Sequence, residues 1–496
     1  MSVDQNAPSK AYGPWGLVLL ALIVAEMTGV FELSSLTVAI PKLMTEFHVS
    51  TAEVSWVLTS FFLVSGAAAA IGGRLGDLFG RRRLLIAALL LSILGSLVSL
   101  TFDTFPAIIA GRAIQGFSGA VLPLVVGISR EAVLPRRVPV TIAIVSGTAT
   151  IAGAAGYLCA GLLIDHSTWH AIFVVAAALA GLAAVLAAVA LRPSPVTYRK
   201  GERIDIFGGA LFVPALALVL YAVTTSNSRG PGSPLVLGPL VGGLALGAFW
   251  VWWELRTPNP LISLRLLRQR KFALIMLVIA LVCLSAIGGG PLLTPVLLQG
   301  PTSAPVGLGL TATAVGLLSL STSGSTFLLS PLSGAISGRM GAQRSFVIGA
   351  VLTTVGTPGF FLFRTHLWLI VATLAVTAIG VAFVLTAIPN LIAEAVPAAN
   401  TSEATGFYVV VKNTCASASI TIASLILASD VVPGTQYTKV SAFGWTVVFL
   451  TLGAAASAGV ALLIRGGGTA ARDSSAEGHP LAGHTPALTS DPSSAG

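Results

Sequence analysis

The chain has 496 residues, of which 55% are hydrophobic and only 9% are charged, and its formal net charge is +9. A soluble domain carries roughly 25% charged residues, so this composition excludes an ordinary soluble protein and indicates a polytopic membrane protein. The excess of cations would also suit a nucleic-acid-binding protein. The cations lie mainly in short polar segments between apolar runs, however, which favours membrane topology, and no nucleic-acid partner is expected.

Apolar runs close to the ~20 residues that a bilayer requires recur along the whole chain. Residues 1–14 are polar and are expected to be disordered, as is the segment 465–496, which is rich in Gly, Ala, Ser and Pro. Between these tails we predict fourteen membrane spans: 15–40, 53–72, 84–101, 107–128, 140–164, 170–191, 205–224, 235–254, 273–298, 309–332, 345–363, 367–392, 404–428 and 443–464.

Lys and Arg residues are divided unevenly between alternate connecting segments. If the N-terminus is cytoplasmic, all but six of the 27 cations fall in inner segments, the exceptions being Lys42, Arg229, Arg364 and Lys439 outside and Arg112 and Lys412 within spans. The positive-inside rule therefore predicts that both termini are cytoplasmic. Arginines far outnumber lysines, and together with the abundant Ala and Gly this indicates a GC-rich bacterial genome and a bacterial plasma membrane.

The most informative stretch is GRLGDLFGRRR, residues 73–83, between the second and third spans. A generic cytoplasmic loop needs only the arginines, whereas this one also has spaced glycines and a single acid. It resembles the loop between helices 2 and 3 of the major facilitator superfamily, G-x-L-x-D-x-x-G-R-(K/R)-x, with matches at Gly73, Leu75, Asp77, Gly80, Arg81 and Arg82. The resemblance implies an all-α major facilitator fold and a cytoplasmic gate formed by Gly73, Asp77, Gly80, Arg81 and Arg82.

A second, fainter copy of this stretch occurs at residues 334–344, GAISGRMGAQR. Two related halves separated by an insert are a pattern of secondary transporters. We expect six-helix bundles at 15–191 and 273–464, with two inserted helices and their cytoplasmic flanks at 192–272. The arrangement of six, two and six spans is similar to the fourteen-span drug:proton antiporter branch of the superfamily.

Charged residues inside spans are candidates for function, because a charge at lipid depth is costly. Glu26 and Glu32 lie six residues apart in the first span, so they face about 120° apart around the helix. The segment FELSSLTVAIP resembles the first helix of the fourteen-span exporters, and Glu32 occupies the acidic position implicated in proton coupling and in binding cationic drugs. We expect Glu32 to be the main proton carrier, with Glu26 as the alternative. A purely structural ion pair is the simpler interpretation.

Arg112 begins GRAIQGFSGA in the fourth span, which resembles the superfamily motif R-x-x-Q-G, with Arg112 and Gln115 matched. A guanidinium keeps its proton and therefore needs an anionic or carbonyl partner. Since the first and fourth helices are neighbours in the fold that this resembles, Arg112 is expected either to tune a first-span glutamate or to act as a structural pin.

The remaining polar candidates lie in the fifth, twelfth and thirteenth spans. The fifth span lacks the Pro and one Gly of the family pattern G-P-x-x-G-G and carries Tyr157. This tyrosine is expected either to face the cavity, or to face lipid or pack in the bundle. In the second half, Asn390, Lys412 and Asn413 are expected to give the cavity a polar wall. The alternative for Lys412 is snorkelling toward the inner face, and the charge of the substrate stays open.

The chain has no phosphate-binding loop, no His inside a span and no G-x-S-x-G motif, so no ATP-driven pump, metal site, cofactor or enzymatic activity is expected. The prediction is a monomeric, proton-coupled exporter of hydrophobic or amphipathic drug-like compounds or antibiotics that works by alternating access in the lipid bilayer. Export or uptake of an endogenous metabolite or lipid is an alternative. A non-transporting membrane sensor or scaffold is the alternative from another class.

Overall fold

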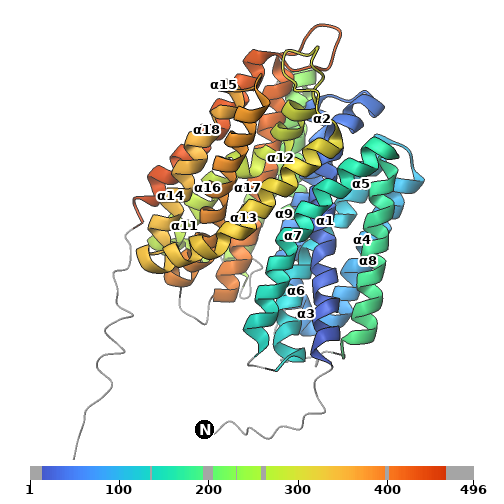
Figure 1. Cartoon of the computed structure of the whole chain (residues 1–496). Coiled ribbons are helices and arrows are strands. Elements are labelled where there is room, and N and C mark those ends of the chain that lie inside the picture. The colour runs from blue at the N-terminus through green and yellow to red at the C-terminus, as the bar shows by residue number, and fades with distance from the viewer. Residues whose placement is uncertain are drawn as a thin grey trace, which may run out of the picture. The chain divides into compact units, whose positions relative to one another are not determined.

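The computed structural model describes residues 14–134, 137–193, 205–230, 232–257, 264–396 and 401–464. In this part of the chain the ordered elements are helices, and one isolated antiparallel bridge joins Val431 to Thr438 (Figure 1). The predicted all-α membrane fold is therefore confirmed.

The helices run along the whole described chain. In chain order they are α1 (Trp15–Phe47), α2 (Thr51–Val54), α3 (Trp56–Phe79), α4 (Arg81–Thr101), α5 (Phe105–Gln115), η2 (Gly116–Ala120), α6 (Val121–Ala132), α7 (Val138–His166), α8 (His170–Ala190), α9 (Ile206–Arg229), α10 (Pro234–Arg256), η4 (Leu264–Arg268), α11 (Arg270–Cys283), α12 (Ala286–Gln299), α13 (Ala312–Met340), α14 (Ala342–Gly356), α15 (Gly359–Leu362), α16 (Leu367–Ala395), α17 (Thr401–Ser429) and α18 (Val440–Ala461).

Twelve helical segments among the described residues are long and apolar enough to cross a membrane. They coincide with twelve of the predicted spans. The other two predicted spans, 140–164 and 309–332, fall on α7 and α13, which are helices of 29 residues each. The chain is therefore a multi-pass membrane protein, and the full count of fourteen spans stays a prediction.

The sequence repeat is visible in the backbone. Gly80 separates α3 from α4 with a φ of 90°, and Gly341 separates α13 from α14 with a φ of 89°. Residues with a Cβ rarely adopt such angles, so glycine is needed at both turns. The two glycines occupy the same position in the repeated stretches 73–83 and 334–344, which supports a relation between the halves. The division into bundles at 15–191 and 273–464 stays a prediction.

Most helix packing lies within each predicted half, and a few helix pairs join the halves. In the first half α1 packs against α7 and α8, and α4 against α5 and α8; in the second half α14 packs against α16 and α18. The inserted helices α9 and α10 pack on each other, and α9 also contacts α3 and α17. The main contacts between the halves are α7 with α13 and α3 with α17.

The pair α3 and α17 is joined by small polar side chains. Ser424 donates a hydrogen bond to Ser55 at 3.1 Å, and Ser417 donates to the Thr59 carbonyl at 3.3 Å. Small hydroxyl residues allow close approach of membrane helices and bond across the interface.

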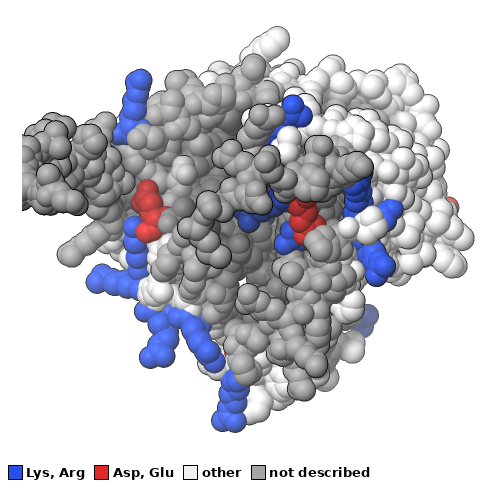
Figure 2. Space-filling view, turned by 90° about the horizontal axis from the view of Figure 1, so that it is seen from below, with Lys and Arg blue, Asp and Glu red and all other residues white. Residues whose placement is uncertain are grey.

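The lower end of the molecule, as it is drawn in Figure 1, carries many cations. Figure 2 views the molecule from that end and shows Lys and Arg side chains gathered there. That is the distribution expected of a cytoplasmic face.

Candidate functional site

Arg112 lies at the centre of a buried polar network in the first half. Its side chain is 0% exposed. Nε donates to the Val57 carbonyl at 3.1 Å, and Nη1 donates to the Glu32 carbonyl at 3.1 Å and to Gln115 Oε1 at 2.9 Å. The guanidinium also lies over the Phe61 ring, 4.3 Å from its centroid. Arg112 of α5 therefore holds the main chains of α1 and α3 together, using the carbonyl partners that a buried guanidinium needs.

The network continues from Gln115 to the carboxyl group of Glu32 through two serines of α4. Gln115 Nε2 donates to Ser96 Oγ at 2.7 Å, and Ser96 Oγ donates to the Ser92 carbonyl at 3.1 Å. Ser92 Oγ in turn donates to Glu32 Oε1. Gly95 allows this close approach, because a Cβ there would collide with the backbone of α5 at Gly111 and Gln115. The small residues of α4 thus bring its hydroxyl groups to α1 and α5.

Two polar atoms of this network have no hydrogen-bond partner among the described residues. They are Glu32 Oε2 and Arg112 Nη2, although both side chains are 0% exposed. The hydrogen bond from Arg112 reaches the backbone oxygen of Glu32 and not its carboxyl group. The expected closeness of the two residues is therefore observed, and the carboxyl group keeps one free oxygen.

Glu26 faces away from this network. Its side chain is 8% exposed, and Oε2 has no hydrogen-bond partner in the described part of the chain. Its electrostatic attraction is to Lys412 of α17, which belongs to the other half. Lys412 Nζ lies 5.9 Å from the centroid of the Tyr408 ring. The six-residue spacing thus directs Glu32 toward α4 and Glu26 toward α17.

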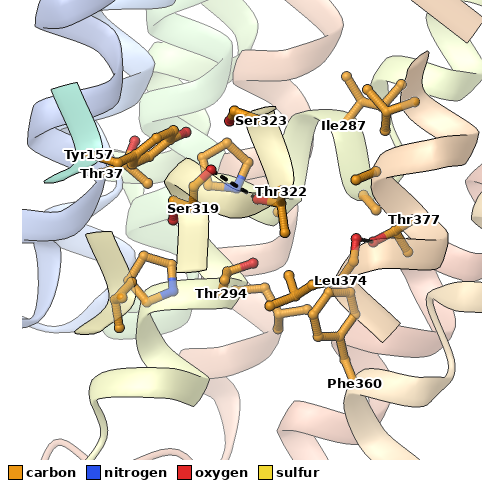
Figure 3. A pocket seen from close by; sticks show the side chains of 18 of the residues that line it. Thr37, Tyr157, Ile287, Thr294, Ser319, Thr322, Ser323, Phe360, Leu374 and Thr377 are labelled. Atoms are coloured by element: carbon orange, nitrogen blue, oxygen red, sulfur yellow. Dashed lines mark hydrogen bonds between the residues drawn. The ribbon is translucent and has the colours of Figure 1, made fainter. Parts of the chain in front are cut away.

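A cavity of about 260 Å³ lies between helices of the two halves. Thr37 of α1 and Tyr157 of α7 lie together on one side, and residues of α12, α13, α15 and α16 form the other (Figure 3). The lining residues are Thr37, Val38, Tyr157, Ala286, Ile287, Gly290, Pro291, Leu293, Thr294, Pro295, Val315, Ser319, Thr322, Ser323, Phe360, Leu374, Thr377, Ala378 and Val381. None of these described lining residues is charged.

Of the sequence-predicted residues, only Tyr157 lines this cavity. Asn413 donates to Ser65 Oγ across the α3–α17 interface at 3.4 Å. Asn390 is exposed and bonds to the Thr386 carbonyl of its own helix at 3.4 Å. Neither asparagine nor Lys412 is among the lining residues. The structure therefore does not bring the three together as one wall of this cavity.

The cavity hydroxyl groups of the second half were not singled out from the sequence. Three of these hydroxyl groups lie on α13. Thr322 and Ser323 come three and four residues after Ser319, which puts them on the same helix face as Ser319. This spacing within the run SLSTSGS was the only available signal. It could not be separated from the ordinary case of hydroxyl groups that bond to their own helix.

The predicted gate residues lie where α3 turns into α4. Arg81 Nη1 donates to the Gly127 carbonyl at 2.9 Å and forms an ion pair with Glu131 Oε1 at 2.9 Å. Arg82 donates to the Ala187 carbonyl of α8 at 3.4 Å. Glu131, in the last turn of α6, was not predicted, and an acid next to an arginine at the end of a span was the signal that could have found it.

Other parts of the predicted gate lie outside the described residues. Gly73 lies in α3 near Pro123 and Gly80 forms the turn, but the side chain of Asp77 is outside the described part. The thirteenth predicted span, 404–428, falls within α17, which begins at Thr401.

At the opposite end of the molecule, Asp165 of α7 binds the first turn of α13. Its two carboxylate oxygens accept from Ala312 N at 3.2 Å and from Thr313 N at 2.7 Å. A carboxylate here satisfies free N–H groups and complements the positive helix end. Closer to the cavity, a Cβ on Gly161 or on Gly316 would collide with the backbone of the facing helix. The two helices that line the cavity are therefore in backbone contact and latched by Asp165.

The structure thus combines an all-helical membrane fold, a glycine turn repeated in both predicted halves and a buried arginine that joins α1, α3 and α5. A family model described as Major Facilitator Superfamily matches residues 22–305 and 301–492. The chain belongs to this superfamily.

Curated relatives include drug exporters. The chain is 30% identical over 376 residues to the multidrug resistance protein Stp of Mycobacterium tuberculosis, covering 74% of this chain and 68% of that one. It is 28% identical over 348 residues to the tetracenomycin C resistance and export protein of Streptomyces glaucescens, covering 70% and 63%. The chain thus spans somewhat less than two thirds of the length of the tetracenomycin C protein and slightly more than two thirds of the length of Stp.

The fold is similar to that of solved transporters. The nucleoside transporter NupG superposes with a TM-score of 0.65 at 12% identity, covering 90% of this chain and 100% of that one.

Proposed function

We propose that this chain exports hydrophobic, drug-like compounds across the bacterial plasma membrane by proton-coupled alternating access, with both termini in the cytoplasm and as a monomer. The observation that carries the proposal is the cavity between the two halves, bounded on one side by α1, the helix that also carries a buried acid. Transporters built from repeats bind substrate at the interface between the repeats. The relatives whose names denote multidrug resistance and antibiotic export support the direction of transport.

Proton coupling is assigned to Glu32. Its carboxyl group is fully buried, and one of its oxygens has no hydrogen-bond partner among the described residues. Thr37, on the same helix, lines the cavity. Because both residues belong to α1, gain or loss of a proton at Glu32 can move the helix that borders the substrate. The less enclosed Glu26, which faces Lys412, is the alternative carrier.

Alternating access further requires contacts that hold each end shut in turn. On the outer end, the Asp165 latch between α7 and α13 is one such contact. On the inner end, we assign the corresponding role to Asp77, because of its place in the sequence motif. Its expected partner is the N-terminus of α17, which begins at Thr401, since the first N–H groups of a helix attract a carboxylate.

An accumulation assay tests the function. The full chain is expressed in a bacterial host that lacks its own efflux pumps, and uptake of tetracenomycin C and of chloramphenicol is followed with and without a proton uncoupler. Cells with the protein should accumulate severalfold less compound, and the uncoupler should remove the difference. Equal accumulation with and without the protein, for both compounds, would refute drug export; a difference that survives the uncoupler would refute proton coupling.

A further inference from the structure

The cavity offers a substrate hydrogen bonds and apolar surface but no charge. Its described lining contains neither acids nor bases. The nearest charged residues that the site contains, Glu26, Glu32 and Arg112, are not among the lining residues. The Glu32 carboxyl group accepts from Ser92, and Arg112 donates to the Val57 and Glu32 carbonyls. A cation that entered this cavity from water would lose its hydration and find no counter-charge, which costs several kcal/mol or more in an apolar setting.

The hydroxyl groups of the lining fall into two sets. Those of Thr37, Thr322 and Thr377 already donate to carbonyls of their own helices, at 3.1, 3.0 and 2.9 Å. A hydroxyl has one proton to donate, so these three can only accept from a ligand. Backbone bonding of this kind is the usual state of Ser and Thr in a membrane helix.

The second set consists of Thr294, Ser319 and Ser323, whose hydroxyl groups have no hydrogen-bond partner among the described residues. All three line the cavity (Figure 3). A ligand that covered them without bonding to them would incur the desolvation cost of each hydroxyl. A ligand with acceptor atoms would satisfy them. Apolar surface for its rings is supplied by Tyr157, on one side, and Phe360, on the other.

We propose that the transported compound is an uncharged molecule bearing carbonyl, ether or similar oxygen atoms, which accept hydrogen bonds from Ser319, Ser323 and Thr294 while its apolar part packs between Tyr157 and Phe360. The inference rests on the proposed function, since it names the substrate class of the same cavity. It separates the site of proton coupling from the site of binding, so the substrate and the proton do not compete for one carboxylate.

Binding to the purified full chain in lipid nanodiscs tests this inference directly. The two probes are chloramphenicol, which is uncharged and carries amide and nitro oxygens, and ethidium, which is permanently cationic. Chloramphenicol should bind at least tenfold more tightly than ethidium. Ser319→Ala and Ser323→Ala should each weaken chloramphenicol binding by about three- to tenfold, the expected loss for one net hydrogen bond. Ser319→Thr, which keeps the hydroxyl group, should bind nearly as the wild type.

The matched control is Ser321→Ala. Ser321 lies on the same helix, is exposed, is absent from the lining and donates to the Leu317 carbonyl at 2.9 Å. This variant should bind chloramphenicol as the wild type does. A loss as large as that of Ser319→Ala would mean that α13 was disturbed as a whole, and would refute the assigned hydrogen bonds.

Transport of the same probes separates this inference from the proposed function. Proton-driven export of ethidium, with binding that is unaffected at Ser319 and Ser323, would overturn the uncharged substrate class and leave the exporter function standing. Chloramphenicol binding that depends on the two serines, without proton-driven movement, would support the substrate class and refute the function. Failure of chloramphenicol to bind would overturn the inference.

Discussion

The buried network and the cavity are both polar regions at lipid depth, yet they are built in opposite ways. The network contains a glutamate and an arginine at 0% exposure, and most of its polar atoms bond to one another. The cavity contains no charged lining residue among those described and includes hydroxyl groups without partners. One region is thus closed on itself, whereas the other is available to a ligand.

The difference shows how one chain can keep protons and substrate apart. Glu32 and Thr37 are five residues apart on α1, which places them about 140° apart around the helix. One faces the network and the other faces the cavity. Communication between the regions must therefore pass through the position of α1 and not through direct contact between proton and substrate. Changes in the network should cost stability or coupling, and changes in the cavity should cost affinity.

Removal of the guanidinium at the centre of the network should have the largest effect. Arg112→Ala leaves the carbonyls of Val57 and Glu32 and the side chain of Gln115 without their donor. Breaking such a buried set costs roughly 3–5 kcal/mol, so little folded protein should be recovered. Thermal unfolding in detergent measures this. Ser319→Ala is the control from the cavity and should unfold within about 0.5 kcal/mol of the wild type, as for an ordinary exposed-site change. If Arg112→Ala had normal yield and stability, the network would not stabilise the fold more than the cavity does, and the proposed difference between the two regions would be wrong.

The next largest effect is expected from neutralising the buried acid. Glu32→Gln retains an oxygen that can accept from Ser92 and should fold, but it cannot release a proton. Export driven by an imposed proton gradient should fall at least tenfold, while chloramphenicol binding should change by less than about twofold. Glu26→Gln, with protein amounts matched, is the comparison. If export survives in Glu32→Gln and is lost in Glu26→Gln, the proton carrier is Glu26; survival in both would remove the first span from coupling.

The sequence predicted the network far better than the cavity. Glu32, Arg112 and Gln115 stand out as polar residues in apolar runs, and the family that their motifs resemble has the first and fourth helices as neighbours. The fold class and the turn at Gly80 were equally visible, because hydropathy, charge bias and a repeated glycine are local signals. The structure added the partners Ser92 and Ser96, which a sequence cannot distinguish from other serines of α4.

The cavity depends on helix rotation, which one sequence does not encode locally. Ser321 and Ser319 are the same residue type two positions apart, yet the former is exposed and bonds to its own helix whereas the latter lines the cavity. For the same reason Tyr157 left two alternatives open until α7 was placed against α13. Asp165 lies at the end of a span, where an acid is unremarkable unless its partner helix is known.

A smaller effect is expected at the outer end of the cavity helices. Asp165→Asn keeps the shape of the side chain but has one acceptor oxygen in place of two. One of the two backbone N–H groups of α13 therefore loses its acceptor, which costs about 1 kcal/mol, and the other keeps a neutral hydrogen bond. The outer contact should open more often, by roughly five- to tenfold for one such bond. A cysteine at position 319 (Ser319→Cys), in a chain whose three native cysteines are replaced, should react correspondingly faster with an impermeant thiol reagent from outside. The network should stay intact, so thermal stability should change little.

The control for this latch is Asp430→Asn. Asp430 lies at the end of α17, and its partners among the described residues are Lys439 at 2.6 Å and Ser441 at 2.7 Å, both in the same predicted half. Its loss should leave the labelling rate unchanged. Equal acceleration by both variants would show that general loosening of the outer surface, and not the latch, controls access to the cavity.

The smallest effect should come from the outermost link of the network. Ser96→Ala removes the acceptor for Gln115 Nε2 but leaves the bond from Ser92 to Glu32 in place. The expected cost is about 1 kcal/mol of stability, with proton-driven export within about twofold of the wild type. Ser99→Ala is the matched control, since Ser99 is also 0% exposed on α4 but donates only to its own helix, to the Gly95 carbonyl at 3.2 Å. If Ser96→Ala instead abolished coupling as fully as Glu32→Gln while Ser99→Ala did not, the proton path would extend through Gln115. The network would then be part of the transport machinery, and its role as a scaffold for a single titrating acid would be wrong.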